Sequence, residues 1–298
     1  MTDISYDART GGAVEEVPTS SASEVDAGLA AAAAAAPVVA ATPPAERKRW
    51  LYAVADAIEV PAAVDELVAV ADRETGLGEE RLRMEIGRTS VQLRYYADVA
   101  VEGSYLDATV DAGLPRLARV RVPLGPVAVF GASNFPFLFS VLGTDTASAL
   151  ASGCPVVVKA HPAHPVLSAR LGALALAALR EAGAPAGLFA LVSGFEAGAR
   201  LVRSPRTTAV AFTGSLGAGR TLFDVASSRP SPIPFYGELG ALNTLVVCPA
   251  AAARGEDIAA GLAASFTLGV GQFCTKPGVV LLPAGAPGEA VRRSLAKR

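Results

Sequence analysis

Hydrophobic and polar positions change their pattern near residue 120. Before that point, residues 1–20 are polar and contain Gly and Pro, so we expect a loose or extended lead-in. Apolar residues then recur at helical spacing, as Leu51, Val54 and Ile58 do at intervals of three and four. This pattern predicts helices over residues 24–36, 45–60, 62–74 and 79–101. The first of these helices is expected to end before Pro37.

After residue 120, short apolar runs rich in β-branched residues alternate with Ala- and Leu-rich stretches of helical length. The runs, which predict strands, are residues 127–130, 155–158, 188–192, 209–212 and 244–247. The stretches between them, which predict helices, include residues 139–151, 165–182 and 197–203. Runs that are apolar at nearly every position are typical of parallel strands buried on both faces. We therefore predict an α/β fold, a doubly wound parallel sheet that follows an N-terminal helical region.

Composition and charge exclude several classes of protein. Hydrophobic residues make up 51% and charged residues 18% of the 298 residues, which excludes a disordered chain. The net charge of −2 gives no reason to expect nucleic acid or an anionic membrane as a partner. The longest uncharged run, residues 122–144, is broken by Pro and Gly and predicts no membrane span. The N-terminus lacks the apolar core of a signal peptide.

The cysteines divide into two kinds. Cys154, Cys248 and Cys274 show no short spacing, so we expect neither a disulfide framework nor a zinc site, and we expect a reducing cytoplasm. Cys154 and Cys248 lie at the edges of apolar runs and are expected to be small buried hydrophobes. Cys274 differs because glycines on both sides let the backbone bend close to a ligand. Its thiol is a candidate nucleophile, and an ordinary surface cysteine is the alternative.

In open α/β sheets, ligands bind beyond the carboxyl ends of the strands, so the residues after each predicted strand are candidate binding residues. Gly214 and Ser215 lie between a strand and a helical stretch, where backbone N–H groups and a helix N-terminus receive a phosphate. The alternative is a tight turn that needs its glycines. Lys159 either neutralises a nucleotide or reaches solvent at its strand end. His161 and His164 lack a nearby acid or cysteine to complete a ligand set, so no metal is expected.

Two further polar residues are candidate catalytic groups. Asn134 lies in an apolar, proline-containing turn after the first predicted strand. Its side-chain amide either donates to a developing oxyanion or bonds its own backbone in the turn. Glu238 lies shortly before an apolar strand. A carboxylate beside apolar neighbours can serve as a general base. An exposed loop carboxylate is the alternative for Glu238.

Taken together, these segments resemble the successive signatures of the aldehyde dehydrogenase superfamily, in the order in which that family has them. The segments are residues 131–136, 159–165, 212–215, 238–240 and 271–274. The stretches VFGASNFP, VKAHPAHP and GQFCT are most similar to an NADP-preferring branch that includes 2,5-dioxovalerate (α-ketoglutaric semialdehyde) dehydrogenases. The resemblance covers about residues 45–283.

The resemblance implies a catalytic role for three residues. Cys274 would be the nucleophile, Glu238 the general base, and Asn134 the side-chain donor of an oxyanion hole that the Cys274 backbone N–H completes. The implied reaction is the oxidation of an aldehyde to its carboxylic acid, with 2,5-dioxopentanoate as the substrate that the branch suggests. The thiolate adds to the carbonyl carbon, hydride passes to the nicotinamide, and water then releases the acid from a thioester.

The same resemblance implies NADP or NAD as the coenzyme. Lys159 would hold the adenosine ribose or its 2′-phosphate, and Gly214 and Ser215 would lie at the pyrophosphate. The expected partner is a small-molecule aldehyde, without nucleic acid or membrane. Full-length members of the family are homo-oligomers, and the expected location is the cytoplasm.

Members of this family are longer than 298 residues, and the Glu-x-Phe-Gly-Pro segment that follows the nucleophile in them is absent here. We therefore expect a Rossmann-like coenzyme-binding domain with the N-terminal helices over residues 1–240, and an incomplete α/β catalytic domain over residues 241–298. We also expect nucleotide binding, and little turnover from this chain by itself. Two functions stay open: an aldehyde dehydrogenase, or an inactive remnant that binds nucleotide or a partner. A CoA-acylating relative is disfavoured because it would have no use for the hydrolytic base Glu238.

Overall fold

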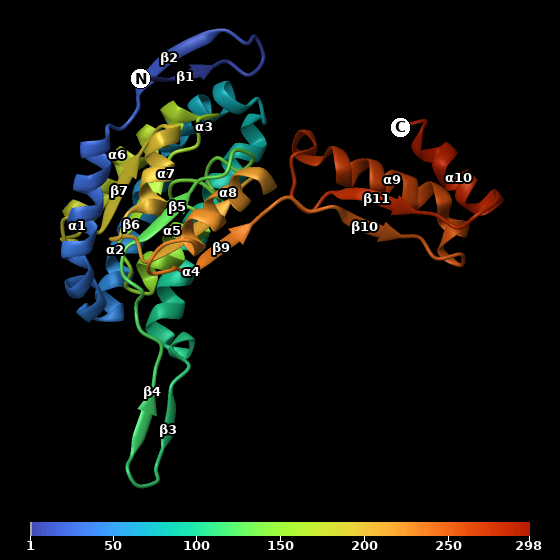
Figure 1. The fold of residues 1–298 in the computed structure, drawn as a ribbon. Coiled ribbons are helices and arrows are strands. Elements are labelled where there is room, and N and C mark those ends of the chain that lie inside the picture. The colour runs from blue at the N-terminus through green and yellow to red at the C-terminus, as the bar shows by residue number, and fades with distance from the viewer. Residues whose placement is uncertain (1) are drawn as a thin grey trace. The chain divides into compact units, whose positions relative to one another are not determined.

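The structure is a computed structural model that describes residues 2–298. The chain divides into two compact units, residues 1–239 (unit 1) and residues 240–298 (unit 2). Unit 1 contains a five-stranded parallel sheet with helices on both of its faces, and unit 2 contains a two-stranded sheet with its own helices (Figure 1).

Unit 1 begins with an antiparallel hairpin, so of the two alternatives for residues 1–20 the loose one is wrong and the extended one fits. Its strands are β1 (Thr2–Tyr6) and β2 (Ala13–Pro18). In the turn between them, the Asp7 carboxylate accepts hydrogen bonds from the backbone N–H groups of Arg9 and Thr10, both at 2.9 Å. These bonds add to the backbone hydrogen bonds of the turn, from the N–H of Asp7 to the oxygen of Gly12 at 2.9 Å and from the N–H of Gly11 to the oxygen of Asp7 at 2.8 Å.

The first helix, α1 (Ala22–Ala41), continues through Pro37, where the sequence predicted its end. Ser21 and Glu24 form a capping box at its N-terminus, and Val39 extends the buried stripe beyond the proline. Burial of this last turn therefore outweighs the missing N–H of Pro37. Among the described helices, α1 alone is long and apolar enough to cross a membrane, a test that a core helix of a soluble protein also passes.

Three helices then form as predicted, with boundaries shifted by at most one residue. They are α2 (Pro44–Glu59), α3 (Pro61–Thr75) and α4 (Glu79–Glu102). Helices α2 and α3 each begin with proline, whose fixed φ suits the first helical position. Left-handed glycines, Gly76 and Gly103, follow α3 and α4, a common way to end a helix.

The central sheet has five parallel strands in the order β7-β6-β5-β8-β9. They are β5 (Val127–Phe130), β6 (Val156–Lys159), β7 (Phe189–Val192), β8 (Ala209–Thr213) and β9 (Phe235–Glu238). Four of them match predicted apolar runs, whereas β9 was not predicted. The fifth predicted run is strand β10 (Asn243–Val246), which pairs in unit 2 rather than in this sheet.

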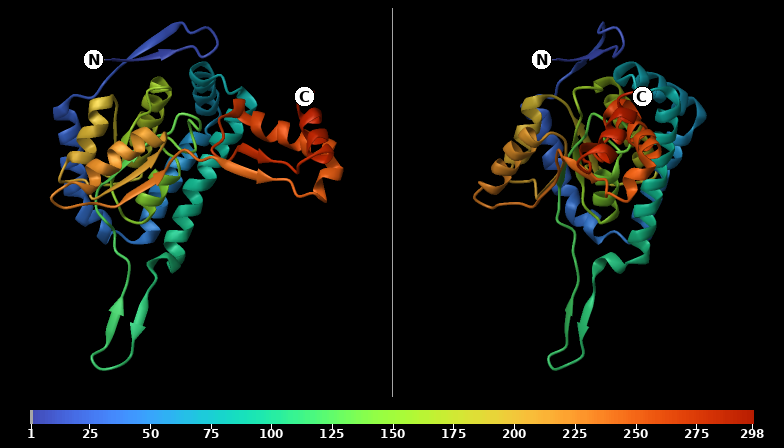
Figure 2. Two further views of the ribbon diagram at one scale, coloured as in Figure 1. Left: turned by 45° about the vertical axis from the view of Figure 1, so that its right-hand side comes forward. Right: turned by 90° about the vertical axis from the view of Figure 1, so that its right-hand side faces the viewer.

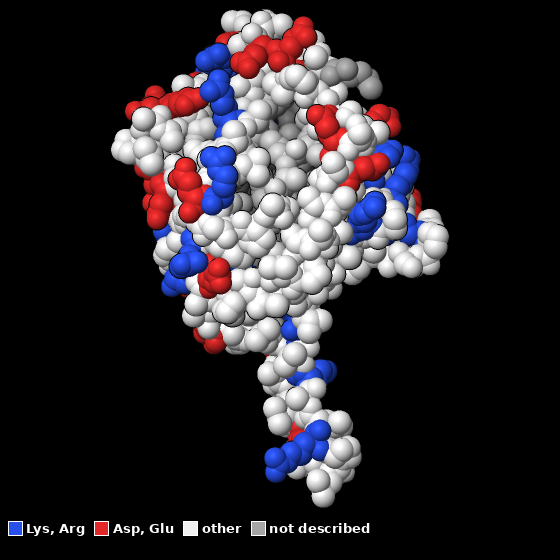
Figure 3. Space-filling view, turned by 90° about the vertical axis from the view of Figure 1, so that its left-hand side faces the viewer, with Lys and Arg blue, Asp and Glu red and all other residues white. Residues whose placement is uncertain are grey.

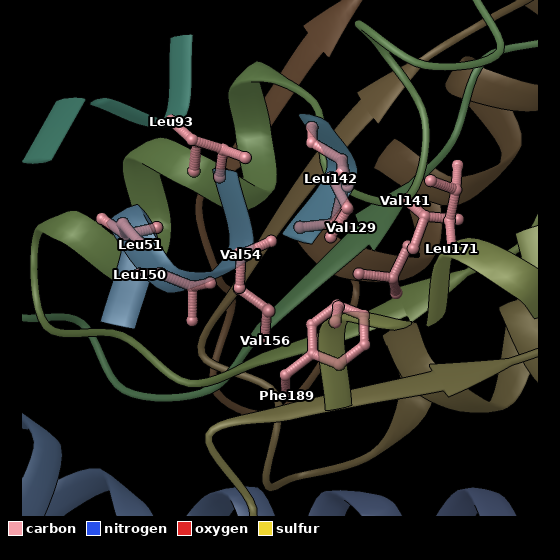
Figure 4. Close-up of a cluster of buried hydrophobic side chains, with 14 of the residues drawn as sticks. Leu51, Val54, Leu93, Val129, Val141, Leu142, Leu150, Val156, Leu171 and Phe189 are labelled. Carbon is pink, nitrogen blue, oxygen red and sulfur yellow. The ribbon is translucent and has the colours of Figure 1, made fainter. Parts of the chain in front are cut away.

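Helices cover both faces of this sheet, which confirms the doubly wound α/β fold. The helices that follow its strands are α5 (Thr144–Ala151), α6 (Pro165–Glu181), α7 (Phe195–Arg203) and α8 (Leu216–Ser227). Val129 of β5 and Val156 of β6 pack with side chains of α2, α4, α5 and α6 on one face (Figure 4). Ala128 and Phe130 pack on the other face with side chains of α1, α7 and α8. Alternate strand residues thus fill two separate cores.

A second hairpin extends away from the rest of unit 1 (Figures 1 and 2). It follows the short helix η1 (Ser104–Leu106) and consists of β3 (Thr109–Asp111) and β4 (Leu117–Arg119). Its apolar side chains are exposed, Leu114 at its tip to 97%.

Unit 2 is built on two parallel strands, β10 and β11 (Pro277–Leu281). Four helices complete it: η2 (Ala251–Arg254), α9 (Gly255–Thr267), η3 (Leu268–Gly271) and α10 (Ala286–Leu295). Helices α9 and α10 bury Ala259, Leu262 and Val291. The segment that carries Cys274 lies between η3 and β11.

Candidate active site

The order of the strands places the candidate residues of unit 1 at one edge of the sheet. The order reverses at β5, which has β6 on one side and β8 on the other, and ligands of open α/β sheets bind where such a reversal occurs. The Asn134 segment follows β5, and Gly214 and Ser215 follow β8. Lys159 is the last residue of β6, and Glu238 is the last residue of β9. Four predicted segments therefore share the carboxyl edge.

Two side chains of α4 hold the backbone of the Asn134 segment. Arg81 donates through Nη2 to the backbone oxygen of Asn134 at 2.7 Å, and its guanidinium lies 4.8 Å from the centre of the Phe135 ring. Glu85 accepts through Oε1 from the backbone N–H groups of Phe137 at 2.9 Å and Leu138 at 3.0 Å. Burial raises the pKa of Glu85, although these two donors oppose the rise. The sequence analysis did not find either residue of this pair.

His164 holds the same segment from the other side. Its ring Nε2 lies 2.9 Å from the backbone oxygen of Ala132, and its Nδ1 lies 3.1 Å from Oγ of Ser168. A carbonyl oxygen accepts only, so Nε2 carries the proton. Burial lowers the pKa of His164, which keeps the ring neutral. Among residues 2–298, no group of three or more His, Cys, Asp or Glu side chains is arranged to hold a metal ion.

Lys159 is buried at the end of β6. Its side-chain carbons run beside Gly198 of α7, where an added Cβ would lie 3.6 Å from Cγ of Lys159. Burial lowers the pKa of Lys159, and the carboxylate of Asp3 opposes this shift. His161, two residues on, has its pKa lowered to about 3, first by burial and then by His164 and Lys159. At neutral pH, His161 is therefore neutral.

The turn after β8 is built to present a helix N-terminus. Ser215 caps α8, and its Oγ accepts from the N–H of Ala218 at 3.3 Å. The N–H of Gly214 donates to the backbone oxygen of Glu238 at 3.0 Å, which joins this turn to the end of β9. A Cβ at Gly219 would lie 2.2 Å from Cδ2 of Leu239, which follows β9, so a larger residue there would have to displace the Leu239 side chain.

Glu238 is the last residue of strand β9 rather than part of a loop, and it is exposed. Its register partner in β8 is Thr213. Half-buried Asp145, in the first turn of α5, has its pKa raised by loss of solvation and further by the charge of Glu238. The charges of Asp145 and Glu238 therefore interact. The sequence did not predict a role for Asp145.

Cys274 lies in unit 2 and is exposed. Asn243 of β10 fixes its backbone, because Nδ2 donates to the oxygen of Cys274 at 2.6 Å and to that of Lys276 at 3.0 Å. Val270, just before this segment, has a φ of +59°, which is strained for a β-branched residue. Strain of this kind is concentrated at functional sites.

The other two cysteines differ from each other. Cys154 is buried as predicted, and its Sγ accepts from the N–H of Leu124 at 3.3 Å. Cys248 is exposed, so the expectation that it is buried is wrong. It follows β10, whose sheet in unit 2 has two strands and leaves alternate residues of β10 exposed. An apolar run predicts burial on both faces only within a sheet that is covered on both faces.

Comparison with known proteins assigns the chain to a family. The family model described as "Aldehyde dehydrogenase family" matches residues 4–297. The chain belongs to the aldehyde dehydrogenase family. "Alpha-ketoglutaric semialdehyde dehydrogenase 2" of Azospirillum brasilense is 50% identical over 250 residues, which are 80% of this chain and 47% of that protein. "Alpha-ketoglutaric semialdehyde dehydrogenase" of Acinetobacter baylyi is 42% identical over 272 residues, which are 88% of this chain and 51% of that protein.

Solved structures share the fold of this chain. HpcC from Thermus thermophilus has a TM-score of 0.87 and 26% identity over all of this chain and 56% of that one. An NAD-dependent benzaldehyde dehydrogenase from Corynebacterium glutamicum has a TM-score of 0.83 and 27% identity over all of this chain and 62% of that one. The chain thus spans about half the length of the curated relatives that it matches.

In this aldehyde dehydrogenase family member, the structure places the predicted residues in two groups. The first group lies at the carboxyl edge of the sheet in unit 1 and consists of Asn134, Lys159, Gly214, Ser215 and Glu238. Cys274 lies in unit 2. The convergence of the Cys274 thiol, the Asn134 amide and the Glu238 carboxylate on one carbonyl group stays a prediction.

Proposed function

We propose that this chain supplies the coenzyme-binding and nucleophile-bearing parts of an NAD(P)⁺-dependent aldehyde dehydrogenase. The observation that carries the proposal is the reversal of strand order at β5, which brings the Asn134 segment and the N-terminus of α8 to one edge. The names of the two curated relatives favour an α-ketoglutaric semialdehyde, 2,5-dioxopentanoate, as the substrate. On this proposal, residues 1–240 are the coenzyme-binding domain and residues 241–298 are part of the catalytic domain.

The residues at the carboxyl edge fit a dinucleotide. The first turn of α8 presents backbone N–H groups beyond the one that Ser215 occupies, and among the described residues no heavy atom outside the neighbouring chain of α8 lies within 4 Å of a Cβ added at Gly217. This space and the positive end of the helix suit a pyrophosphate beside Gly214 and Ser215. Lys159 would hold the adenosine ribose. When bound, the coenzyme supplies the acceptor for the hydride that the aldehyde loses.

The side chains then divide the reaction between them. The Cys274 thiolate forms a bond to the aldehyde carbon, and the carbonyl oxygen becomes an oxyanion that the Asn134 amide stabilises by donating to it. Loss of hydride from that carbon leaves an acyl thioester on Cys274. Glu238 takes a proton from water, the hydroxide attacks the thioester carbon, and the carbon–sulfur bond breaks to release the carboxylic acid and the thiolate.

The supports around Asn134 suit this role. Arg81, Glu85 and His164 fix the backbone on either side of Asn134 through hydrogen bonds of 2.7–3.0 Å. A donor that is already in place when the oxyanion forms lowers the barrier, because it needs no reorganisation. The Arg81–Glu85–His164 arrangement therefore acts as a support for the oxyanion-hole donor.

The experiment that tests this proposal measures acylation of Cys274 rather than steady-state turnover. The chain is mixed with 2,5-dioxopentanoate and NAD(P)⁺, and reduced coenzyme and the mass of the Cys274 peptide are measured. The proposal predicts a thioester on Cys274 and at least an equal amount of reduced coenzyme, neither of which forms with Cys274→Ala. Asn134→Ala slows acylation by about 10²–10³-fold, the usual loss for one such donor. Nucleotide binding without any acylation would support the inactive, nucleotide-binding alternative instead.

The exposed hairpin β3–β4 supports the expectation of a homo-oligomer. Val110 is 75% exposed and Leu117 is 61% exposed, and both belong to a ribbon that extends from unit 1 (Figure 2). Covering these side chains with a second subunit removes apolar surface from water. Val110→Ser with Leu117→Ser would then lower the assembly state in sedimentation. The cytoplasm remains the proposed location, in keeping with three free cysteines.

A further inference from the structure

The N-terminal hairpin turns a polar face toward the coenzyme edge of unit 1. Along β1, Asp3 and Ser5 point inward, whereas Ile4 and Tyr6 are exposed. Ser5 donates through Oγ to the carboxylate of Glu74 at 2.7 Å. Glu74 in turn accepts from the N–H groups of the first turn of α6, at 3.0 and 2.9 Å. One part of the hairpin is therefore fixed over the loop that follows β6.

The other part of the hairpin is fixed to the end of β7. Oγ of Ser193 donates to the backbone oxygen of Pro18 at 3.0 Å, and Pro18 pairs with Thr2 beside the Asp3–Val17 pair. Ser193 follows Val192, which is the register partner of Lys159 in β6. Asp3 thus lies between two anchors that flank the end of β6, and its carboxylate interacts with the charge of Lys159. Figure 3 shows the surface of unit 1 hollowed below this hairpin.

Asp3 carries an oxygen that needs a donor. Its Oδ2 is buried and has no hydrogen-bond partner within the described part of the chain. A buried carboxylate oxygen without a donor is costly, so a donor from a ligand is favoured there. Lys159 interacts electrostatically with Asp3, and His161 is neutral because its pKa is about 3. The site therefore pairs one acceptor with one donor rather than gathering positive charge.

We propose that Asp3 and Lys159 together receive the vicinal hydroxyls of the adenosine ribose, and that Asp3 makes the chain select NAD⁺ over NADP⁺. The inference rests on the proposed coenzyme-binding function. A ribose 2′-hydroxyl donates to a carboxylate, as an acidic residue commonly accepts it in dinucleotide sites. A 2′-phosphate carries about −1.5 to −2 charges at neutral pH and would be repelled by Asp3. This selectivity is opposite to the NADP preference that the resemblance to its branch implies.

Calorimetric titration of NAD⁺ and of NADP⁺ into the whole chain tests the proposal without requiring turnover. The wild type is expected to bind NAD⁺ more tightly than NADP⁺. Asp3→Asn keeps the size of the side chain and removes its charge, and lowers the ratio of the NADP⁺ Kd to the NAD⁺ Kd by about tenfold. Glu16→Gln is the matched control, because Glu16 pairs with the outward-facing Ile4 on the same hairpin. It leaves the ratio unchanged.

The possible failures can be told apart. If both dinucleotides bind but Asp3→Asn leaves their ratio as in the wild type, the role of Asp3 is wrong and the proposed function stands. A wild-type chain that binds NADP⁺ more tightly than NAD⁺ also overturns the role of Asp3. If neither dinucleotide binds, both this inference and the proposed coenzyme-binding function are wrong. Circular dichroism of Asp3→Asn, expected to match the wild type, shows that the hairpin change leaves unit 1 folded.

Discussion

Single residues outside the predicted set determine how the candidate active site is held. Arg81 and Glu85 lie one helical turn apart on α4, and together they contact the backbone at Asn134, Phe137 and Leu138. In the sequence, these two residues belong to an alternating charge pattern that is typical of a solvated helix face. The pattern gives no sign that two of the charges turn inward, because their partners lie about fifty residues away in the chain.

Removing the Glu85 carboxylate leaves two buried N–H groups without an acceptor. We therefore expect Glu85→Ala to lower the free energy of unfolding by about 2 kcal/mol, and Glu85→Gln to lower it less because an amide oxygen still accepts. Urea unfolding measures both. Glu80→Ala, at an exposed acid on the same helix, is the control and should change the free energy by less than about 0.5 kcal/mol. Equal stability of Glu85→Ala and the wild type would contradict the account.

Glu74 predicts a pH dependence of stability. Burial raises the pKa of Glu74 above its ordinary value of 4.5. The folded state thus binds a proton more tightly than the unfolded state, and ionised Glu74 weakens folding at neutral pH. This penalty disappears as the pH falls through the raised folded pKa toward 4.5.

Wild type and Glu74→Gln are compared by urea unfolding at a series of pH values. The wild type is expected to gain stability relative to the variant as the pH falls from neutrality, since the variant has no proton to bind at this position. A difference that stays constant, or that shifts in favour of the variant at low pH, would show that burial does not control this carboxyl.

At the scale of elements, the apolar pattern predicted those whose stability comes from a hydrophobic face. The buried strands β5 to β8 and helices α2 to α4 follow from it. The pattern missed the β1–β2 hairpin because the inner face of β1 carries Asp3 and Ser5 rather than apolar side chains. It also missed β9, a short edge strand with Gly237 and Glu238. Elements that cover or border a polar site give little hydrophobic signal.

Helix α8 offers a test at this scale with two glycines in its first turns. A Cβ at Gly219 would lie 2.2 Å from Cδ2 of Leu239 and 3.1 Å from Cε1 of Phe212. A Cβ at Gly217 would have no heavy atom of the described residues within 4 Å, apart from the neighbouring chain of α8. We expect Gly219→Ala to destabilise unit 1 by about 1–3 kcal/mol through overpacking.

Gly217→Ala is the matched control for this test. It is expected to be neutral or to stabilise by up to about 1 kcal/mol, because alanine favours a helix over glycine. Thermal unfolding measures both variants. If the two substitutions had the same effect, the close packing of α8 against β9 would not be what requires glycine at position 219.

For the whole molecule, the sequence predicted the fold class and the position of candidate binding residues just after the strands. The doubly wound sheet follows from local patterns, and the reversal at β5 then brings distant segments together. Local patterns carry no information on contacts between residues far apart in the chain. The convergence of Asn134, Glu238 and Cys274, which belong to two units, therefore rests on the family resemblance and the proposed chemistry.

Cross-linking tests this convergence most directly, because it does not depend on turnover. Asn134→Cys in a Cys248→Ser background is treated with a short bis-maleimide in the presence of NAD⁺, and the linked peptides are identified by mass spectrometry. The account predicts a link between the introduced thiol and Cys274, and none when the thiol is introduced by Leu114→Cys at the tip of the β3–β4 hairpin. Failure of Asn134→Cys to link to Cys274, in a chain that binds NAD⁺, would contradict it.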